Sequence, residues 1–192
     1  MNEDMTGGAA AEPVWEEEIR TTDAQQTQAV AERLGRRLAA GDLLLLTGEL
    51  GAGKTTFTQG LGRGLGVRPG IISPTFVLVR IHPSLADGPD LVHVDAYRLG
   101  SSGEIDDIDL ENTMDTSVTV VEWGRGLVEH LSESRLEVTL LRPTGAGAAG
   151  AQGEGQPEGT AGLSFEYDDD PDEERVITFA AYGPRWKDNR LS

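Results

Sequence analysis

The sequence predicts an α/β fold, in which helices flank a mostly parallel sheet and an antiparallel hairpin is added at the C-terminal end. Short apolar β runs alternate with helical patterns between residues 42 and 141, as in sheets of parallel strands joined by helices. Over residues 42–65 a strand pattern, a glycine-rich turn and a helix pattern follow one another directly. Alternating patterns at 163–167 and 175–179 predict the two paired strands of the hairpin.

The chain before the glycine-rich turn predicts one edge strand and one helix. Residues 1–14, rich in Ala, Gly and acidic side chains, are expected to form a disordered lead-in, and residues 15–20 an edge strand. A capping-box pattern opens at Thr22, and the helix that follows is expected to end at Gly41 as its C-cap. Its apolar stripe consists of Val30, Ala31, Leu34 and Leu38. We interpret this helix mainly as core packing.

Residues 48–56, GELGAGKTT, match the pattern G-x-x-x-x-G-K-[ST] at every fixed position. Glycines allow a tight turn in which successive backbone N–H groups face a phosphate at the positive end of the next helix. Lys54 is expected to reach the β- and γ-phosphates, and the Thr55 hydroxyl to be a Mg²⁺ ligand. A chance glycine-rich turn is the alternative in a chain with 25 glycines. However, Lys54 and Lys187 are its only lysines, so the motif predicts a nucleotide phosphate site in a P-loop NTPase-like fold.

The rest of the chain predicts further strands and short helices in one domain. Apolar β runs lie at residues 77–81, 91–95, 118–122 and 136–141, and helical segments are expected within 104–115 and at 126–131. Phe57, Leu61 and Leu65 form the apolar face of the helix after the glycine-rich turn. These elements define a P-loop domain over residues 15–142.

The C-terminal quarter has a different composition. Residues 143–162 are almost all Gly, Ala, Gln, Pro and Thr, which predicts a flexible insertion because no core can form from them. The acidic segment 168–174 predicts a solvated loop. The hairpin, taken as 163–183, is assigned to the P-loop domain, and 184–192 to a tail.

Composition and charge restrict the setting. The chain has no Cys, which excludes disulfides and thiolate metal sites and is typical of an intracellular protein. No apolar run approaches the ~20 residues of a membrane span, and the N-terminus lacks the pattern of a secretory signal, so a cytoplasmic location without membrane contact is expected. The net charge of −17 opposes direct high-affinity binding to nucleic acid, and we expect a partner protein to supply any basic surface.

Two β runs end in a carboxylate, and both are candidates for chemistry beside the phosphate loop. Asp95 closes LVHVD and Glu122 closes VTVVE. The C-terminal ends of parallel strands face the ligand in open α/β sheets. Hydrolysis of a nucleotide needs a carboxylate that holds Mg²⁺ or orients the attacking water. Each acid alone is equally explained as a solvated strand end, but two beside a P-loop favour a functional role.

Three other features leave alternatives open. The Ser73-Pro74-Thr75 segment is a candidate for a loop that senses the γ-phosphate, or else a capped turn before a strand. Arg98 is interpreted as an ion-pair partner of nearby acids rather than a phosphate ligand. His93, on the same strand face as Asp95, is interpreted as structural rather than as a metal ligand.

With SPTF, HVDAYRL and VEW following GELGAGKTT in this order, the chain resembles the bacterial TsaE (YjeE) family over roughly residues 22–141. The resemblance implies a P-loop fold and ATP hydrolysis with Mg²⁺. It further implies assembly with the TsaB and TsaD proteins, which install threonylcarbamoyl on adenosine 37 of ANN-decoding tRNAs. In that assembly tRNA is reached through the partners. The chain departs from many members at Gly124, where they have Pro, and in the acidic segment after Leu99.

The resemblance also implies roles for individual residues. Thr22 and Ala24 match the helix start that contacts the nucleotide base, and Ser73 and Thr75 match the switch-like loop. Glu122 matches the family's second Mg²⁺-associated acid, Asp95 its strand-end aspartate, and Trp123 the partner of that Glu. The expected metal ligands are Thr55, Glu122 and Asp95. The phosphate loop is matched by Glu49, Gly51, Ala52, Gly53, Lys54, Thr55 and Thr56. The expected catalytic set is Lys54, Thr75, Asp95 and Glu122.

Other functions on the same loop are less well supported by the sequence. A small-molecule kinase usually needs an Arg-rich lid, and no clustered Arg follows the core strands. A GTPase is disfavoured because the sequence has no N-K-x-D motif. A nucleotide-gated binding module with negligible turnover stays open, because turnover in such a family can depend on the assembled complex.

Overall fold

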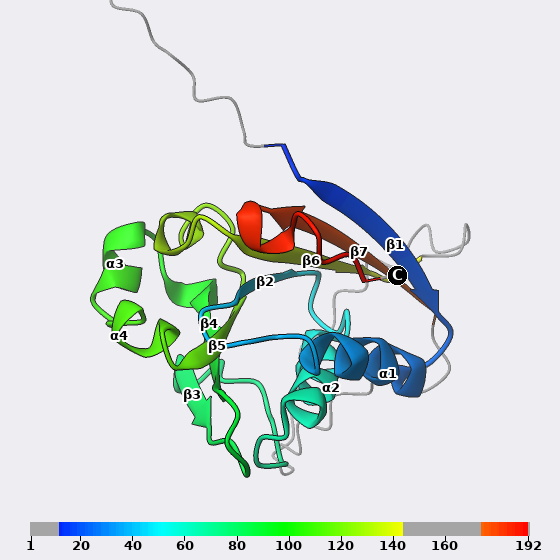
Figure 1. Ribbon diagram of the computed structural model, residues 1–192, viewed down its shortest axis with the longest axis horizontal. Coiled ribbons are helices and arrows are strands. Elements are labelled where there is room, and N and C mark those ends of the chain that lie inside the picture. Colours follow the sequence, from blue (N-terminus) through cyan, green and yellow to red (C-terminus); the bar gives the residue numbers. More distant parts are fainter. Residues whose placement is uncertain (1–11, 144–173, 192) are drawn as a thin grey trace, which may run out of the picture.

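A computed structural model describes residues 12–143 and 174–191, and these residues form a seven-stranded sheet with helices on both of its faces (Figure 1). The strand order is β1-β7-β6-β2-β5-β4-β3. The central strands β6, β2, β5 and β4 run parallel, whereas β3, β7 and β1 pair antiparallel at the two edges. The predicted α/β class with a mostly parallel central sheet and antiparallel strands at the C-terminal end is therefore confirmed.

The element bounds are as follows. The strands are β1 (Trp15–Thr21), β2 (Leu43–Thr47), β3 (Val79–His82), β4 (Asp90–Asp95), β5 (Ser117–Glu122), β6 (Arg135–Leu141) and β7 (Arg175–Tyr182). The α-helices are α1 (Ala24–Gly35), α2 (Lys54–Leu65), α3 (Ser102–Asp106) and α4 (Glu111–Met114). Three short 3-10 turns are η1 (Ala96–Arg98), η2 (Glu129–Leu131) and η3 (Pro184–Trp186).

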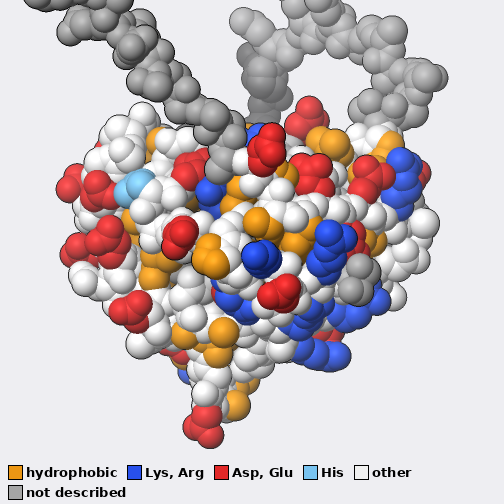
Figure 2. Space-filling model, turned by 45° about the horizontal axis from the view of Figure 1, so that its top comes forward, with side chains coloured by type: hydrophobic (Ala, Val, Ile, Leu, Met, Phe, Trp, Pro, Cys, Tyr) orange, Lys and Arg blue, Asp and Glu red, His pale blue; other side chains and the backbone are white. Residues whose placement is uncertain are grey.

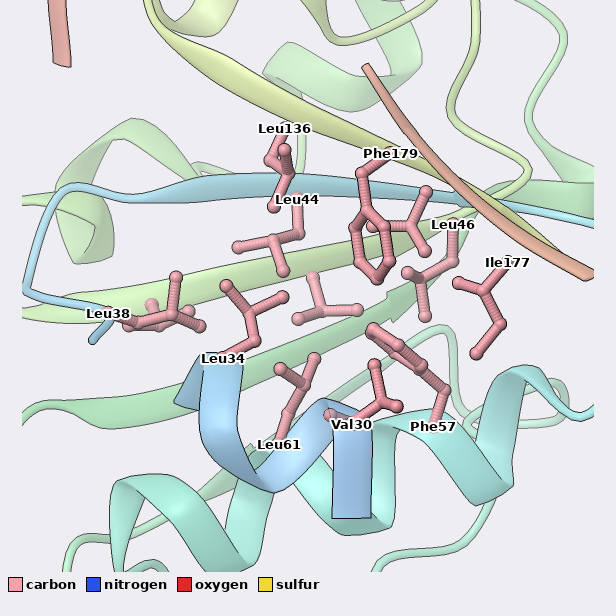
Figure 3. Close-up of a cluster of buried hydrophobic side chains, with 14 of the residues drawn as sticks. Val30, Leu34, Leu38, Leu44, Leu46, Phe57, Leu61, Leu136, Ile177 and Phe179 are labelled. Carbon is pink, nitrogen blue, oxygen red and sulfur yellow. The ribbon is translucent and has the colours of Figure 1, made fainter. Parts of the chain in front are cut away.

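The strand that leads into the glycine-rich loop, β2, lies in the middle of the sheet and is covered on both faces. Leu44 and Leu46 belong to the cluster between the sheet and helices α1 and α2 (Figure 3). Leu43 and Leu45 enter a second cluster, with Ile105 of α3. Successive side chains of a strand point to opposite faces, so an unbroken apolar run is what a strand covered on both sides requires. Each fully buried Leu contributes about 1.5–3 kcal/mol, and the loop is thus attached to a rigid strand.

The helix that follows the loop, α2, packs closely on α1 because glycines lie at the contact. A Cβ on Gly60 would lie 2.3 Å from the Gln28 backbone oxygen and 2.7 Å from the Ala31 Cβ. These separations leave no room for a side chain, since overpacking forces shifts that cost about 1–3 kcal/mol. Figure 3 shows the consequence: Leu61 of α2 and Leu34 of α1 lie side by side under the sheet. The close pair fixes where the N-terminus of α2 meets the loop.

The start of α1 differs by one residue from the expectation. The N-cap is Asp23 rather than Thr22, because the Asp23 carboxylate accepts a hydrogen bond from the Gln26 N–H at 2.7 Å. The Gln26 side chain in turn accepts from the Thr22 N–H at 3.2 Å. The N-cap is therefore an acidic side chain, among the best N-caps, and the Gln26 side chain binds back to the residue just before it.

The end of α1 was predicted too late. The helix ends at Gly35, with Arg36 as C-cap, whereas Gly41 lies in the turn into β2 with φ +93°. Leu38 is still buried, because its N–H donates to the Gly35 carbonyl in a tightened turn. Such i→i−3 bonds continue the helical periodicity of side chains without a regular α-helix, which explains why the apolar stripe extended past the helix.

Two further boundaries need correction. The strand expected from residue 77 begins at Val79, because the N–H groups of Val77 and Leu78 both donate to the Pro74 carbonyl, at 2.9 and 2.7 Å. Leu78 has φ +69°, so this stretch is a turn that Pro74 anchors. The helix expected over 126–131 is only the 3-10 turn η2. The partial helicity expected within 104–115 is confirmed by α3 and α4.

The C-terminal strand has other partners than the expected ones. Residues 175–179 do form a strand, as part of β7, but β7 pairs with β6 on one edge and with β1 on the other. The expected first strand of the hairpin, 163–167, lies outside the described residues, as do the predicted insertion over 144–162, most of the acidic segment 168–174 and residues 1–11 of the lead-in. The N-terminal and C-terminal strands therefore complete one sheet, which the edge-strand prediction for residues 15–20 anticipated in part.

The segment predicted as a tail is docked on the domain. Trp186 is 2% exposed and its carbonyl accepts a hydrogen bond from the Trp15 indole N–H at 2.7 Å. Arg185 donates to both oxygens of the buried Asp42, at 2.9 and 3.0 Å. Arg185 also donates to the Arg37 carbonyl at 3.1 Å. These contacts attach residues 184–191 to β1 and to the connection between α1 and β2, at the sheet end opposite the loop.

Charge is unevenly distributed over the surface despite the net −17. Figure 2 shows Lys and Arg side chains gathered on one side of the face it presents, with Asp and Glu side chains spread elsewhere. Arg37, just after α1, donates to the Leu191 carbonyl at 3.2 Å and accepts from Arg185 at its own carbonyl, so these two basic residues are neighbours. The acidic balance of the chain is therefore an average over regions of both signs.

Candidate nucleotide-binding site

The glycine-rich loop joins β2 to α2 in the order that the motif requires. Gly53 is the residue before α2 and has φ +95°, a backbone conformation that side chains with a Cβ rarely adopt. The Phe57 N–H donates to the Gly53 carbonyl at 2.8 Å and so begins the helix. The first N–H groups of a helix have no acceptor within it, and they form a natural site for an anion.

Lys54 is held inside the loop by backbone oxygens and an indole ring. Its side-chain ammonium donates to the carbonyls of Gly48 at 2.9 Å and Glu49 at 3.0 Å. The Nζ atom also lies 4.6 Å from the centroid of the Trp123 ring, within cation–π range. Burial lowers the pKa of Lys54, and the negative charges of Glu122 and Asp95 act in the opposite direction. The ammonium is thus placed beside two acids in a partly desolvated site.

The two strand-end acids are neighbours across the sheet. Asp95 of β4 and Glu122 of β5 are paired residues in the parallel ladder, and Glu122 is also level with Leu46 at the end of β2. The loop begins at Gly48, directly after the last residue of β2, Thr47, so it starts beside both acids. Parallel pairing therefore brings Asp95 and Glu122, 27 residues apart in the numbering, to the edge of the sheet that carries the loop.

Asp95 is oriented by the loop over residues 71–78 and by its own backbone. The Thr75 hydroxyl donates to Asp95 Oδ2 at 2.6 Å, and the Tyr97 N–H donates to Oδ1 at 3.0 Å. The Ser73 and Thr75 hydroxyl oxygens are 2.7 Å apart. Since the Thr75 proton points to the carboxylate, Ser73 is the donor to Thr75. The Ser-Pro-Thr segment forms a turn before β3 and is also hydrogen-bonded to a site acid.

Glu122 is oriented from the interior of the sheet. Its Oε1 lies 2.8 Å from Nε2 of His93, which is completely buried. The next residue, Trp123, has φ +59°, and its N–H donates to the Leu46 carbonyl at 3.1 Å. This local turn places the indole over Lys54 and against the Tyr97 ring, at 5.9 Å between centroids.

These residues line one cavity of about 470 Å³, within the usual range for small-molecule sites. Its walls include most of the residues predicted for the site: Gly51, Gly53, Lys54, Thr55, Thr56, Ser73, Thr75, Asp95, Glu122 and Trp123. Four other predicted residues, Thr22, Ala24, Glu49 and Ala52, do not line it. Thr22 and Ala24 lie at the start of α1, where Thr22 bonds with Gln26. Glu49 contributes only its carbonyl, to Lys54.

Sequence reasoning missed several residues of the site. Leu50, Gln59, Ile72 and Phe76 also line the cavity, and Leu50 and Phe76 are 77% and 79% exposed. Leu50 lies within the loop motif and Phe76 within SPTF, and these motifs were the available signal. Arg175 at the start of β7 donates from Nε to the Ala52 carbonyl at 3.2 Å, a contact between segments 123 residues apart that no local pattern indicates.

Residues 12–143 and 174–191 contain neither a preformed metal-binding cluster nor a membrane-spanning helix. No group of three or more His, Cys, Asp and Glu side chains there is arranged to hold a metal ion. Likewise, no helix in the described part of the chain is long and apolar enough to cross a membrane.

A glycine-rich loop and two strand-end acids around one cavity define the chain as an α/β protein with a mostly parallel sheet and a candidate nucleotide site. The family model described as "Threonylcarbamoyl adenosine biosynthesis protein TsaE" matches residues 21–147. The chain belongs to the TsaE family, and its role lies in tRNA threonylcarbamoyladenosine biosynthesis. The resemblance deduced from the four sequence motifs is thereby confirmed.

Individual relatives agree with this assignment. The tRNA threonylcarbamoyladenosine biosynthesis protein TsaE of Streptomyces coelicolor is 51% identical over 158 residues, covering 80% of this chain and 91% of the relative. The Bacillus subtilis protein of the same name is 34% identical over 170 residues, covering 88% and 87%. The crystal structure of Bacillus subtilis YdiB matches with a TM-score of 0.60 at 30% identity, over 90% of each chain.

Proposed function

We propose that this chain is a Mg²⁺-dependent ATPase that acts in tRNA N6-threonylcarbamoyladenosine formation, together with the TsaB and TsaD proteins, on ANN-decoding tRNAs. The observation that carries the proposal is the shared cavity, in which Lys54, Thr55, Asp95 and Glu122 meet. An ammonium, a hydroxyl and two carboxylates beside a helix N-terminus are the groups that phosphoryl chemistry on a nucleotide uses. The names of the relatives support the pathway.

The residues present fit Mg²⁺ bound together with a nucleotide. Thr55, Asp95 and Glu122 offer only oxygen donors, which Mg²⁺ prefers, and this ion usually takes one or two carboxylates plus substrate phosphates rather than a cage made by protein alone. That preference agrees with the lack of a three-ligand cluster among the described residues. When bound, Mg²⁺ would neutralise charge that develops on the phosphate oxygens.

Each side chain then has a distinct task. Lys54, now donating to two loop carbonyls, would exchange one of them for a phosphate oxygen. The Thr55 hydroxyl and Asp95 would hold the metal. Glu122, fixed by His93, would accept a hydrogen bond from the attacking water and orient it toward the γ-phosphate. Ser73 and Thr75 would connect the state of the nucleotide to the loop through Asp95.

The proposal includes a setting in the cytoplasm and indirect contact with tRNA. The net charge of −17 disfavours strong binding to RNA by this chain alone. TsaB and TsaD would therefore carry the tRNA, while this chain supplies the hydrolysis cycle.

The first test concerns binding. Lys54→Ala is expected to lower the affinity for ATP with Mg²⁺ by at least about 100-fold, because a buried charge-assisted contact to phosphate is lost. Calorimetric titration of the isolated chain measures this, and Lys187→Ala is the matched control at the only other lysine. Unchanged affinity in the Lys54 variant would overturn the phosphate-site assignment.

The second test concerns turnover. Glu122→Ala is expected to retain ATP binding and to lose about 100-fold or more in hydrolysis measured with TsaB and TsaD present, because the water-orienting group is gone. Retained turnover would transfer that role to Asp95. Lack of turnover in the unsubstituted protein with both partners would leave a nucleotide-gated binding module, the alternative that the exposed apolar rim at Leu50 and Phe76 favours.

A further inference from the structure

Outside the residues that line the cavity, one buried side chain touches the proposed water-orienting acid. His93 lies in the middle of β4, with 0% of its surface exposed, and its Nε2 is 2.8 Å from Glu122 Oε1. Glu122 itself is 3% exposed. The contact crosses from β4 to β5, two strands whose pairing is parallel and continuous. It is therefore a short polar contact within a rigid, solvent-poor part of the sheet.

The proton in this contact can be placed. A carboxylate only accepts hydrogen bonds, so the His93 ring donates through Nε2–H. Nδ1 has no hydrogen-bond partner among the residues that the structure describes, so no second acceptor competes for the orientation of the ring. The ring is held by β4 on one side and directed at one oxygen of Glu122 on the other. The second oxygen, Oε2, is the one left for the cavity.

We infer that His93 is a positioning residue for Glu122 in ATP hydrolysis: it occupies Oε1 and thereby fixes the rotamer in which Oε2 orients the attacking water. This inference rests on the proposed function, since it assigns no task to His93 apart from Glu122. A side chain that contacts the substrate keeps its orientation only if neighbouring residues lock its rotamer. Hydrogen-bonding partners of functional carboxylates typically matter by about 10- to 100-fold.

A purely structural role makes different predictions. If His93 only filled the interior, its replacement by an apolar side chain of similar volume would change stability without a specific effect on turnover. If His93 positions Glu122, loss of the donor lowers kcat while the affinity for ATP stays close to its original value, because Lys54 and the loop backbone do not depend on it. A replacement that keeps an N–H donor restores part of kcat.

The test uses full-length protein with TsaB and TsaD and compares three variants. His93→Leu is expected to lower kcat for ATP hydrolysis about 10- to 100-fold with KM within about threefold. His93→Gln keeps an amide donor and is expected to recover at least about threefold of the loss. Thr119→Val is the matched control: Thr119 of β5 is fully buried, its hydroxyl has no hydrogen-bond partner among the described residues, and it does not line the cavity, so its kcat should be unchanged.

A second readout needs no activity. In protein with ¹⁵N-labelled histidine rings, the Nε2–H signal of His93 is expected to be present and to shift or vanish in Glu122→Ala, while the signal of His130, which contacts Asp106, stays in place. His93→Leu and His82→Leu assign the signals. The nucleotide affinity of His93→Leu, measured by calorimetry, should match the unsubstituted protein within about threefold.

The outcomes separate the inference from the proposed function. Unchanged kcat in folded His93→Leu, or an Nε2–H signal that ignores Glu122→Ala, overturns the positioning role even if Glu122→Ala abolishes turnover. Equal losses in His93→Leu and Thr119→Val also overturn it, because they indicate general destabilisation. If Glu122→Ala retains full turnover, the proposed role of Glu122 fails instead. The contact between His93 and Glu122 that NMR detects would then have no role in hydrolysis.

Discussion

Asp95 and Glu122 are neighbours on β4 and β5, yet they are held from opposite sides. Asp95 is held from the surface, by the Thr75 hydroxyl of a loop that also carries the exposed Phe76. Glu122 is held from the interior, by a histidine with no exposed surface. A core contact resists rearrangement because interiors are close-packed, whereas a surface loop can change its contacts at lower cost. The site thus combines one fixed acid with one acid coupled to a loop.

Two aromatic residues connect the two sides. Tyr97 follows Asp95 and Trp123 follows Glu122, and their rings meet edge to face, 5.9 Å apart and at 64°. The Trp123 ring also lies beside the Lys54 ammonium. Asp95, the acid held by the loop, is therefore linked through Tyr97 to Trp123, the ring that lies beside Lys54.

The largest expected effect comes from breaking the loop side. Thr75→Val keeps the shape and removes the hydroxyl that donates to Asp95 Oδ2 at 2.6 Å. Hydrogen bonds to charged groups contribute about 1.5–3 kcal/mol, so kcat with TsaB and TsaD is expected to fall about 10- to 100-fold. Steady-state kinetics check this, with Thr75→Ser as the variant that keeps the hydroxyl. Equal turnover in the Val and Ser variants would remove Thr75 from the switch-like role.

An intermediate effect is expected where the two sides meet. Trp123→Leu removes the ring that lies 4.6 Å from Lys54 Nζ. Cation–π contacts contribute about 0.5–2 kcal/mol, so ATP affinity should fall about 2- to 30-fold, as measured by calorimetric titration. Trp123→Phe retains a ring and should lose less. If Phe and Leu weaken binding equally, the ring face is not what stabilises the ammonium.

The smallest effect concerns the interior side that supports Glu122. Burial lowers the pKa of His82 from 6.5, and the neighbouring His93 and Arg80 lower it further. The unfolded chain therefore takes up this proton at a higher pH than the folded chain, and stability is lost as the pH falls below 6.5. Above that value His82 is neutral in both states and contributes nothing.

Urea unfolding at about pH 7.5 and about pH 5.5 tests this pH dependence. His82→Leu lacks the titrating group, so it should lose less stability between the two pH values than the unsubstituted protein. His130→Leu is the control, because His130 pairs with the exposed Asp106 at 2.9 Å. Equal losses for His82→Leu and the unsubstituted protein would show that another group carries the acid sensitivity.

The sequence predicted more of the site than of the edges of the fold. Lys54, Asp95 and Glu122 line one cavity, because a motif and two parallel strand ends determine their placement. The partners of β7 were not predicted, since pairing between distant strands leaves no local signal. The role of His93 was likewise hidden, because a histidine in an apolar run indicates burial but not which side chain it meets.

By itself the sequence determined the phosphate loop, the alternation of strands and helices, and the family, because these depend on short segments whose chemistry is local. The tertiary structure alone decided how each acid is held. Thr75 and Asp95 are 20 residues apart, and His93 and Glu122 are 29 apart. Only the folding of β4 beside β5, and of the Ser73–Thr75 loop beside β4, brings such pairs within hydrogen-bond distance. Packing, rather than composition, therefore made one acid of the site fixed and the other responsive to a loop.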